Sequence, residues 1–161
     1  MSDELTRIVT IISIVGAGLT GGVFFAFSTF VMKGLDRLPS PQAIAAMNAI
    51  NKAAPSDPWF MTALFGTAVT CVVVAMPSLR HLDDPAARYR VVAAVLYLIA
   101  IVLTGAYHVP RNDRLAAMDP ASADAASAWA RYVADWTSWN HVRTIGPLTA
   151  ALALILSLRR T

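Results

Sequence analysis

Four long runs of the sequence contain no Asp, Glu, Lys or Arg, and this feature limits the possible folds more than any other. The runs extend over residues 8–32, 58–79, 91–110 and 144–158. At about 1.5 Å of rise per helical residue, about 20 apolar residues cross the hydrocarbon core of a bilayer. The last run has only 15 residues, but it becomes long enough if His141 and Arg143 lie at the interface. The sequence therefore predicts four transmembrane helices.

Two other interpretations of these runs fit the sequence poorly. A cleaved signal peptide begins with basic residues and has a shorter apolar run, whereas residues 2–4 here are Ser-Asp-Glu. Core helices of a soluble protein keep a polar face, and residues 69–76 and 91–96 offer none. We therefore predict an all-α fold, an integral membrane four-helix bundle in a single domain of residues 1–161. Its spans lie at about 8–32, 59–79, 90–109 and 141–158, with short extramembrane helices in the first and third connections.

Composition and charge narrow the classes of partner. The chain is 57% hydrophobic and 14% charged, well below the charged content of ordinary soluble domains. Its net charge is +3, but the basic residues flank the spans singly and form no continuous patch. This distribution predicts contact with the anionic headgroups of a lipid bilayer and no nucleic-acid partner. The single cysteine, Cys71, lies within a span and excludes both a disulfide framework and a thiolate metal cluster.

Glycines in the first span form a small-xxx-small pair, Gly18 and Gly22. Such pairs let two helices approach closely in a bilayer, where lipid supplies no hydrophobic drive for packing. We predict that this pair packs against another helix of the same chain; contact within a homo-oligomer is the alternative.

The two longer connections each contain a predicted helix. Ser40 and Pro41 have the residue types that begin helices, and the first of these helices runs to about Ala53. Asn48 and Asn51 share one of its faces, and we expect that face to turn toward the polar residues described next. The third connection contains an Ala-rich helix over about 122–138. Its aromatic residues recur at intervals of three or four: Trp129, Tyr132, Trp136 and Trp139.

The orientation follows from the arginines. One side of the predicted topology carries six basic residues packed into few loop residues: Arg7, Arg80, Arg88, Arg90, Arg159 and Arg160. The other side carries six basic residues in longer loops. Short basic loops stay in the cytoplasm, so we expect both termini to be cytoplasmic, in an inner (plasma) membrane of the bacterial type.

Unusual polar residues gather where the third span ends and the fourth begins. On the fourth helix, Trp136, Asn140 and Arg143 share one face. On the third, Thr104 and His108 are stacked one turn apart. Ionisable residues within a membrane are costly unless they have partners, and they mark functional sites by default. Histidine also exchanges protons near neutral pH. We therefore expect a functional site at this end; helix capping at the interface is the structural alternative.

A metal site is an alternative use of the same residues. His108 and His141, with Asp113 as the nearest carboxylate in the sequence, have the donor types that hold a transition metal. Two histidines on facing helices also suit a haem. No HxxxH or ExxH pattern places two ligands on one helix. We predict no cofactor, with a transition metal or haem as the alternative.

Five motifs in order along the chain resemble the DUF1772 family of anthrone-oxygenase-like membrane proteins. They are GGVFFAFS at 21–28, FVM at 30–32, AMNAIN at 46–51, HVPRND at 108–113 and WTSWNHVR at 136–143. The resemblance implies a small four-spanning protein. It also implies a reaction in which an acidic methylene between aromatic rings loses a proton, and the resulting carbanion reacts with O₂.

Such a reaction needs a base, donors for an anionic oxygen, and an apolar pocket. The resemblance implies His108 or His141 as the base. Arg143 with Asn112 or Asn140 would then stabilise the anion. The residues expected to contact the substrate are Phe24, Asn48, Asn51, Tyr107, Trp136 and Trp139.

These observations support two hypotheses. The first is a membrane oxidoreductase of the oxygenase type that acts on a lipophilic, aromatic small molecule. The second is a small binding or accessory protein whose polar end binds a metal, a haem or a protein partner. A cavity bordered by the polar cluster favours the first; side chains that fill this space favour the second.

Overall fold

The computed structural model describes residues 2–159, and its regular secondary structure is entirely helical, with no strand among these residues. Within this range, four helical columns are long and apolar enough to span a membrane. The first runs from Asp3 to Leu35, the second from Pro58 to Ser78, the third from Pro85 to Ala116 and the fourth from Ala125 to Leu158. The predicted fold class is therefore confirmed.

Three of the columns change helix type along their length. The first consists of α1 (Asp3–Ala26), η1 (Phe27–Val31) and α2 (Met32–Leu35). The second consists of α4 (Pro58–Met61), η3 (Thr62–Gly66) and α5 (Thr67–Ser78). The third consists of α6 (Pro85–Leu103), η4 (Thr104–His108) and α7 (Val109–Ala116). In each, the η segment is a π-helical turn. The fourth column is a single α-helix, α8 (Ala125–Leu158).

Local sequence explains where the columns begin. Ser2 accepts a hydrogen bond from the Leu5 N–H, and Asp57 and Asp84 do the same for Phe60 and Ala86. These side chains satisfy N–H groups that lack an intrahelical partner. Proline follows at the first position of the second and third columns, where its missing N–H costs nothing.

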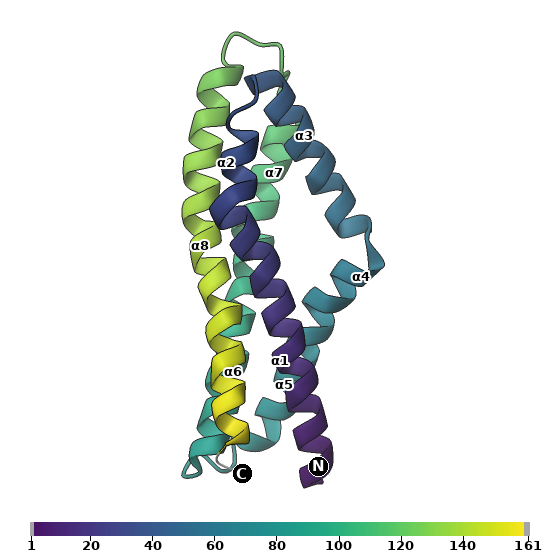
Figure 1. Ribbon diagram of the computed structural model, residues 1–161, viewed down its shortest axis with the longest axis vertical. Coiled ribbons are helices and arrows are strands. Elements are labelled where there is room, and N and C mark those ends of the chain that lie inside the picture. Colours follow the sequence, from purple (N-terminus) through teal and green to yellow (C-terminus); the bar gives the residue numbers. More distant parts are fainter. Residues whose placement is uncertain (1, 160–161) are drawn as a thin grey trace.

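The four columns form a bundle in which α8 packs against α1 and α6, and α5 packs against α6 and α1. Both ends of the chain lie at the same end of the bundle, as an even number of spans requires (Figure 1). At the other end, α3 (Ser40–Ala53) contacts α7 and α8. It then runs back along the bundle to a 3₁₀ turn, η2 (Ala54–Ser56), from which α4 returns to the other helices (Figure 1). We call this bend the α3–α4 elbow.

The third connection differs from the prediction in extent. The helix expected over about 122–138 is present, but it continues without a break into the fourth span as α8. The third span likewise continues through η4 into α7, so that only residues 117–124 are not part of a long helix. Between Ser138 and Thr144 no Gly or Pro interrupts the backbone hydrogen bonds, and Asn140 and Arg143 there are buried. The change from apolar to polar composition therefore does not end the helix.

The prediction for Gly18 and Gly22 is wrong as far as packing within the chain is concerned. A Cβ atom at either position would meet nothing within 4 Å. Close helix packing instead uses Gly16 against Thr67, Gly21 against Leu148, and Gly146 against the Leu96 carbonyl oxygen, which a Cβ at Gly146 would approach to 2.8 Å. The homo-oligomer contact through Gly18 and Gly22 stays a prediction.

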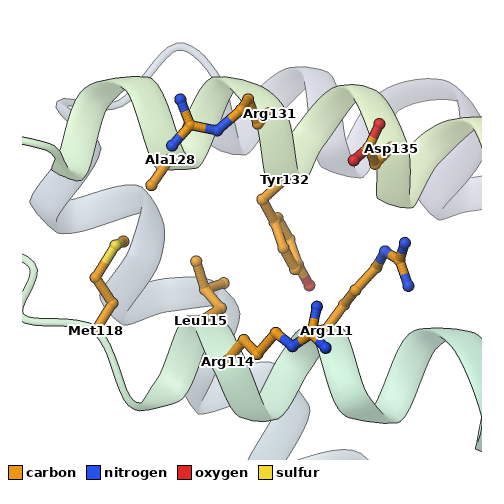
Figure 2. A pocket seen from close by; sticks show the side chains of 8 residues that line it. All are labelled: Arg111, Arg114, Leu115, Met118, Ala128, Arg131, Tyr132 and Asp135. Carbon is orange, nitrogen blue, oxygen red and sulfur yellow. The ribbon is translucent and has the colours of Figure 1, made fainter.

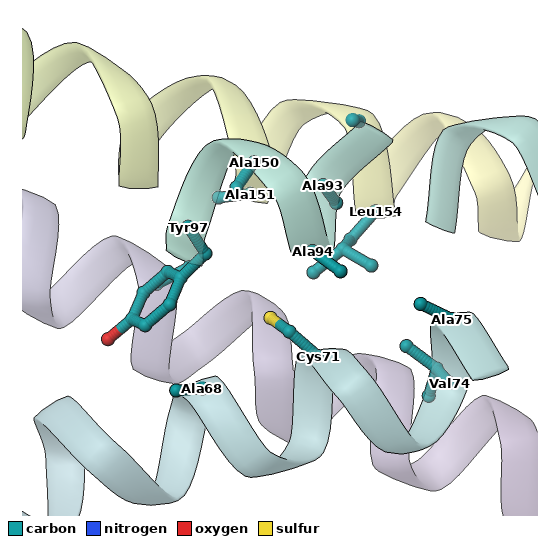
Figure 3. Close-up of a cluster of buried hydrophobic side chains, with 12 residues drawn as sticks. Ala68, Cys71, Val74, Ala75, Ala93, Ala94, Tyr97, Ala150, Ala151 and Leu154 are labelled. Carbon is teal, nitrogen blue, oxygen red and sulfur yellow. The ribbon is translucent and has the colours of Figure 1, made fainter. Parts of the chain in front are cut away.

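The half of the bundle nearest the termini has a core of small side chains (Figure 3). Most of its buried residues are alanines from α5, α6 and α8, joined by Cys71, Val74, Tyr97 and Leu154. Outside the core, large apolar side chains are exposed on every column, for example Val15, Phe30 and Val102 at 64–65%. An exposed apolar surface of this extent fits contact with the lipid bilayer.

Candidate active site

Within residues 2–159, three of the four columns contain a π-helical turn, and residues from all three turns line one cavity. Phe27 comes from η1, Leu64 and Phe65 come from η3, and Thr104 and Gly105 come from η4. π-Helical turns are rare and often occur at functional sites. Each one rotates the side chains that follow it relative to a regular α-helix.

The cavity has a volume of about 430 Å³ and lies beside the α3–α4 elbow. Its walls are mostly apolar and aromatic, with a few polar groups at one side. The lining residues are Val23, Phe24, Phe27, Met47, Ile50, Asn51, Ala54, Pro55, Phe60, Met61, Leu64, Phe65, Ile101, Thr104, Gly105, Val109, Asn112, Trp136 and Arg143. A cavity of this size and character suits a lipophilic small molecule.

Arg143 is the charged group of this cavity. Its side chain is 6% exposed, and its guanidinium lies 4.2 Å from the Phe24 ring centroid and 5.2 Å from that of Trp136. Nε and Nη2 both donate to Asn140 Oδ1, at 3.1 and 2.8 Å, and Nη1 donates to Thr104 Oγ1 at 3.4 Å. No carboxylate among the described residues pairs with it. Because a guanidinium has five N–H donors, two remain available to a ligand.

Asn140 fixes the position of Arg143. Its Nδ2 donates to the Phe24 carbonyl and to Ser28 Oγ, both at 2.8 Å, so that its Oδ1 must face the arginine. Ser28 in turn is hydrogen-bonded to Thr144 at 2.9 Å. Asn140 and Ser28 are buried. This network leaves Asn140 without spare donors, so it positions the arginine and does not contact a ligand itself.

The amide of Asn112 is oriented by two donors. Tyr132 Oη and Trp136 Nε1 both donate to Asn112 Oδ1, at 2.8 and 3.0 Å. Since two donors can only converge on the oxygen, the assignment of O and N in this amide is unambiguous. The Nδ2 group is left as a free donor on a residue that lines the cavity.

The α3 helix adds a further donor from the face that carries Asn48 and Asn51. Ile44 and Met47 anchor α3 in the second core cluster, with Trp129 and Trp136 of α8. Asn51 lines the cavity, and its buried Nδ2 forms no hydrogen bond of regular geometry among the described residues, although the Tyr132 hydroxyl lies close. Asn48 does not line the cavity, but its buried Oδ1 also lacks a partner there.

His108 is buried, with 1% of its surface exposed, but it does not line the cavity. Its Nδ1 lies 3.1 Å from the Leu103 carbonyl, an arrangement that requires the proton on Nδ1. Its ring packs edge-on against Trp136, with centroids 5.0 Å apart. Nε2 has no partner of regular geometry among the described residues, although the Trp136 backbone lies close.

The three π-helical turns share a feature that the sequence does not reveal. A buried side chain donates to a carbonyl at or close to each of them. Asn140 donates to Phe24, Tyr97 donates to Leu64 at 2.9 Å, and His108 is bonded to Leu103. Side chains that insert into the backbone ladder are a known cause of helix irregularity. These polar residues therefore help to shape the helices around the cavity.

The structure separates some of the predicted site residues from the cavity. His141 is exposed and lies outside the lining, so the structure does not bring it together with His108 as a shared site. Trp139 is 43% exposed, and its ring centroid lies 4.9 Å from that of Tyr107. The Tyr107 ring also stacks against the Arg111 guanidinium. Phe24, Asn51, Asn112, Trp136 and Arg143 do line the cavity.

Sequence reasoning missed one wall of the site. Phe60, Met61, Leu64 and Phe65 belong to the second column, which contains no Asp, Glu, Lys or Arg between Pro58 and Leu79. Nothing in an uninterrupted apolar run distinguishes residues that face a cavity from residues that face lipid.

A metal is not favoured by the arrangement of donors. Among residues 2–159, no three His, Cys, Asp or Glu side chains lie together as a ligand set. His108 is buried, whereas His141 and Asp113 are exposed. The alternative set of His108, His141 and Asp113 is therefore not assembled.

Comparison with known proteins gives one family. No curated protein and no solved structure matches the chain. The sequence model of the anthrone oxygenase family matches residues 57–153, which is more than half of the chain. This segment begins at the cap of α4 and includes Asn112, Trp136 and Arg143. With its four membrane-spanning helices and this match, the chain belongs to the anthrone oxygenase family, also described as DUF1772.

Proposed function

We propose that the protein binds a lipophilic aromatic molecule bearing an acidic C–H group, of the anthrone type, as its oxyanion and promotes its oxidation by O₂. The observation that carries this proposal is Arg143, a buried cation without a carboxylate partner at the wall of an apolar cavity. A buried charge in a membrane protein is costly unless something neutralises it. An anionic ligand would supply the missing charge.

The polar groups of the cavity with spare hydrogen-bonding capacity include donors on three residues. They are the two remaining N–H groups of Arg143, Nδ2 of Asn112 and Nδ2 of Asn51. The Thr104 hydroxyl, by contrast, already donates to the Ala100 carbonyl. Donors held in place by other hydrogen bonds stabilise a developing oxyanion without reorganising. This arrangement favours a ligand that carries negative charge on oxygen and is otherwise apolar.

The chemistry then follows from the substrate. Loss of the methylene proton of an anthrone gives an enolate whose charge rests largely on the carbonyl oxygen, where Arg143 and Asn112 would stabilise it. The electron-rich ring carbon reacts with O₂ and forms a C–O bond, giving a hydroperoxide after protonation. Loss of water then leaves a second carbonyl. In sum, anthrone and O₂ give anthraquinone and water, and the four electrons from the substrate reduce the O₂.

The lining residues do not include a carboxylate or an imidazole within the described chain. We therefore propose that the donors lower the pKa of the bound substrate enough for water to accept its proton. A general-base role for His108 or His141 stays a prediction from sequence, since neither ring lines the cavity. In this scheme no bound cofactor is required, because the enolate reacts with O₂ directly.

The test compares two ligands of the same tricyclic shape. Detergent-purified protein is incubated with anthrone or with 9,10-dihydroanthracene, which lacks the oxygen. We expect anthrone to bind at least about tenfold more tightly, the effect of one charge-assisted hydrogen bond. We also expect anthraquinone formation and O₂ consumption above the protein-free rate. Equal affinities would refute the oxyanion site, and turnover at the protein-free rate would refute the enzymatic role.

We further propose that the termini are cytoplasmic in an inner (plasma) membrane, which places the α3–α4 elbow toward the opposite face. The arginine density of the short 80–90 loop supports this orientation. Cysteine introduced at Asp84 should react with an impermeant reagent only from the cytoplasm, and cysteine at Asp124 only from outside. The reverse pattern would invert the orientation.

A further inference from the structure

A second hollow lies between α7 and the beginning of α8 (Figure 2). Its volume is about 370 Å³. The lining residues are Arg111, Arg114, Leu115, Met118, Ala128, Arg131, Tyr132 and Asp135. Three of these residues are arginines and one is an aspartate, so the hollow has an excess of positive charge.

The charges in this hollow are not neutralised within the chain. Among the described residues, Asp135 forms no ion pair with Arg111, Arg114 or Arg131. Three like charges around one hollow repel one another and produce a positive potential. A bound oxyanion would relieve this repulsion through charge-assisted hydrogen bonds.

One of the arginines is held in place before any ligand binds. The Arg111 guanidinium carbon lies 3.4 Å from the Tyr107 ring centroid, and Nη1 donates to the Tyr107 carbonyl at 3.4 Å. Stacking on an aromatic ring leaves the edge of the guanidinium available for hydrogen bonds. The floor of the hollow is supplied by Leu115, which is buried, and by the Tyr132 ring.

The position of the hollow favours an anion from the aqueous phase. Asp135 lies six residues and Ala128 thirteen residues before His141, the predicted start of the fourth span. Along a continuous helix these separations correspond to about 9 and 20 Å. The headgroup layer is only about 5–8 Å thick on each side of the hydrocarbon core. The hollow therefore lies at or beyond the headgroups.

We infer that this hollow is a binding site for a water-soluble oxyanion, a phosphate or carboxylate group, held by Arg111, Arg114 and Arg131. It is separate from the apolar cavity, yet one hydrogen bond lies between them. The Tyr132 ring lines the hollow, and its hydroxyl orients Asn112, which lines the cavity. An anion here contacts the residue that fixes one of the cavity donors.

The experiment measures binding of inorganic phosphate by calorimetry to protein in zwitterionic nanodiscs, at constant ionic strength. We expect saturable binding that falls about tenfold in each of Arg111→Gln, Arg114→Gln and Arg131→Gln, the loss of one charge-assisted contact. Arg88→Gln, at the opposite end of the bundle, should bind as the wild type does. Absence of saturable binding, or equal affinity in all four variants, would overturn the inference.

Two further arms make the result decisive. Asp135→Asn removes the opposing charge and should bind phosphate several-fold more tightly, a gain that misfolding cannot produce. Nanodiscs that contain an anionic lipid should leave phosphate binding unchanged; competition by that lipid would refute an aqueous ligand and identify a headgroup site. None of these measurements depends on anthrone, so the outcome is independent of the activity proposed for the cavity.

Discussion

The two ends of the bundle contain the same four helical columns but pack them in different ways. Near the termini the columns are regular α-helices, and alanine and glycine let their backbones approach closely. At the other end three columns pass through π-helical turns, and the space between them contains large aromatic rings and the cavity. Tyr97 lies at the boundary, where its hydroxyl donates to Thr20 and to the Leu64 carbonyl.

This difference shows how one bundle combines a half packed through small side chains with a half that contains a cavity. In a bilayer, helices associate mainly through close packing and hydrogen bonds between helices. The half near the termini uses close packing, and the half with the cavity relies on hydrogen bonds between helices. We call them the close-packed half and the open half. If this division is correct, substitutions in the open half should change the turnover of anthrone. Substitutions in the close-packed half should change the free energy of unfolding of the protein.

The largest effect is expected at Arg143, in the open half. Replacement by Met removes the charge and its two available donors, and anthrone turnover should fall by about 10²–10³-fold, as on loss of an oxyanion donor. Arg143→Lys should also be impaired, because Lys cannot donate two hydrogen bonds to Asn140 and still reach a ligand. Arg88→Met, at the far end, is the control. If Arg143→Met turned over anthrone normally, the open half would not differ from the rest of the bundle in its effect on turnover.

In the close-packed half, Gly146→Ala should lower the free energy of unfolding by about 1–3 kcal/mol, the usual cost of overpacking. The added methyl would lie 2.8 Å from the Leu96 carbonyl oxygen, which is backbone and cannot move aside easily. Unfolding in mixed micelles with increasing dodecyl sulfate measures the effect. Gly22→Ala is the matched control, since its methyl meets nothing within 4 Å. A similar cost at both glycines would contradict the close packing inferred for Gly146.

A substitution at Gly105, in the open half, should lower activity without lowering stability. It lines the cavity, and a Cβ there meets nothing within 4 Å. Gly105→Leu should occupy part of the cavity and lower kcat/KM for anthrone about tenfold, or about 1.4 kcal/mol, without lowering stability. Gly34→Leu provides the comparison, because Gly34 also has open space around it but does not line the cavity. Loss of stability in Gly105→Leu alone would mean that this space is already filled.

The smallest effect on the free energy of unfolding is expected at Tyr97, at the boundary between the two halves. Tyr97→Phe removes the hydroxyl that bonds Thr20 and Leu64, and it should cost about 0.6 kcal/mol, the average for a hydrogen bond between membrane helices. Tyr89→Phe on the same helix should be neutral in the same unfolding assay, because the Tyr89 hydroxyl forms no hydrogen bond within residues 2–159. An equal effect of the two changes would show that the Tyr97 hydroxyl does not stabilise the turn at Leu64.

The general fold could be predicted from the sequence because it depends on where charges are absent. A charged residue in the hydrocarbon core is costly, so the four charge-free runs leave little choice of topology. The common face of Trp136, Asn140 and Arg143 was also predictable, since α8 is a regular helix through these residues. Arg143 and Asn140 are hydrogen-bonded to each other on this face.

The rest of the site depends on features without a sequence signal. A π-helical turn adds one residue to a turn and thereby rotates every later side chain relative to a regular helix. The faces of the first three columns beyond their π turns therefore cannot be derived from the 3.6-residue period. The prediction of Gly18 and Gly22 as the packing pair failed for a related reason. Several small residues are available in α1, and only the neighbouring helices decide which of them are used.

The histidines show a further limit. Both lie near the cluster in sequence, but His108 and His141 have opposite environments. His141 follows Asn140 directly, so a helix turns its side chain about 100° away from the face that contains Asn140 and Arg143. Counting the helical period along α8 separates His141 from Arg143, whereas residue type alone groups them together.

The unbroken course of α8 has a consequence for how the chain tolerates insertions and deletions. One helix carries Tyr132 at the arginine-lined hollow, Arg143 at the cavity and Leu154 in the close-packed half. Adding a single residue between them would turn one part against the other by about 100° and shift it by about 1.5 Å along the helix axis. Changes in length should therefore be excluded from α8 and accepted in the 117–124 connection, where no helical phase has to be kept.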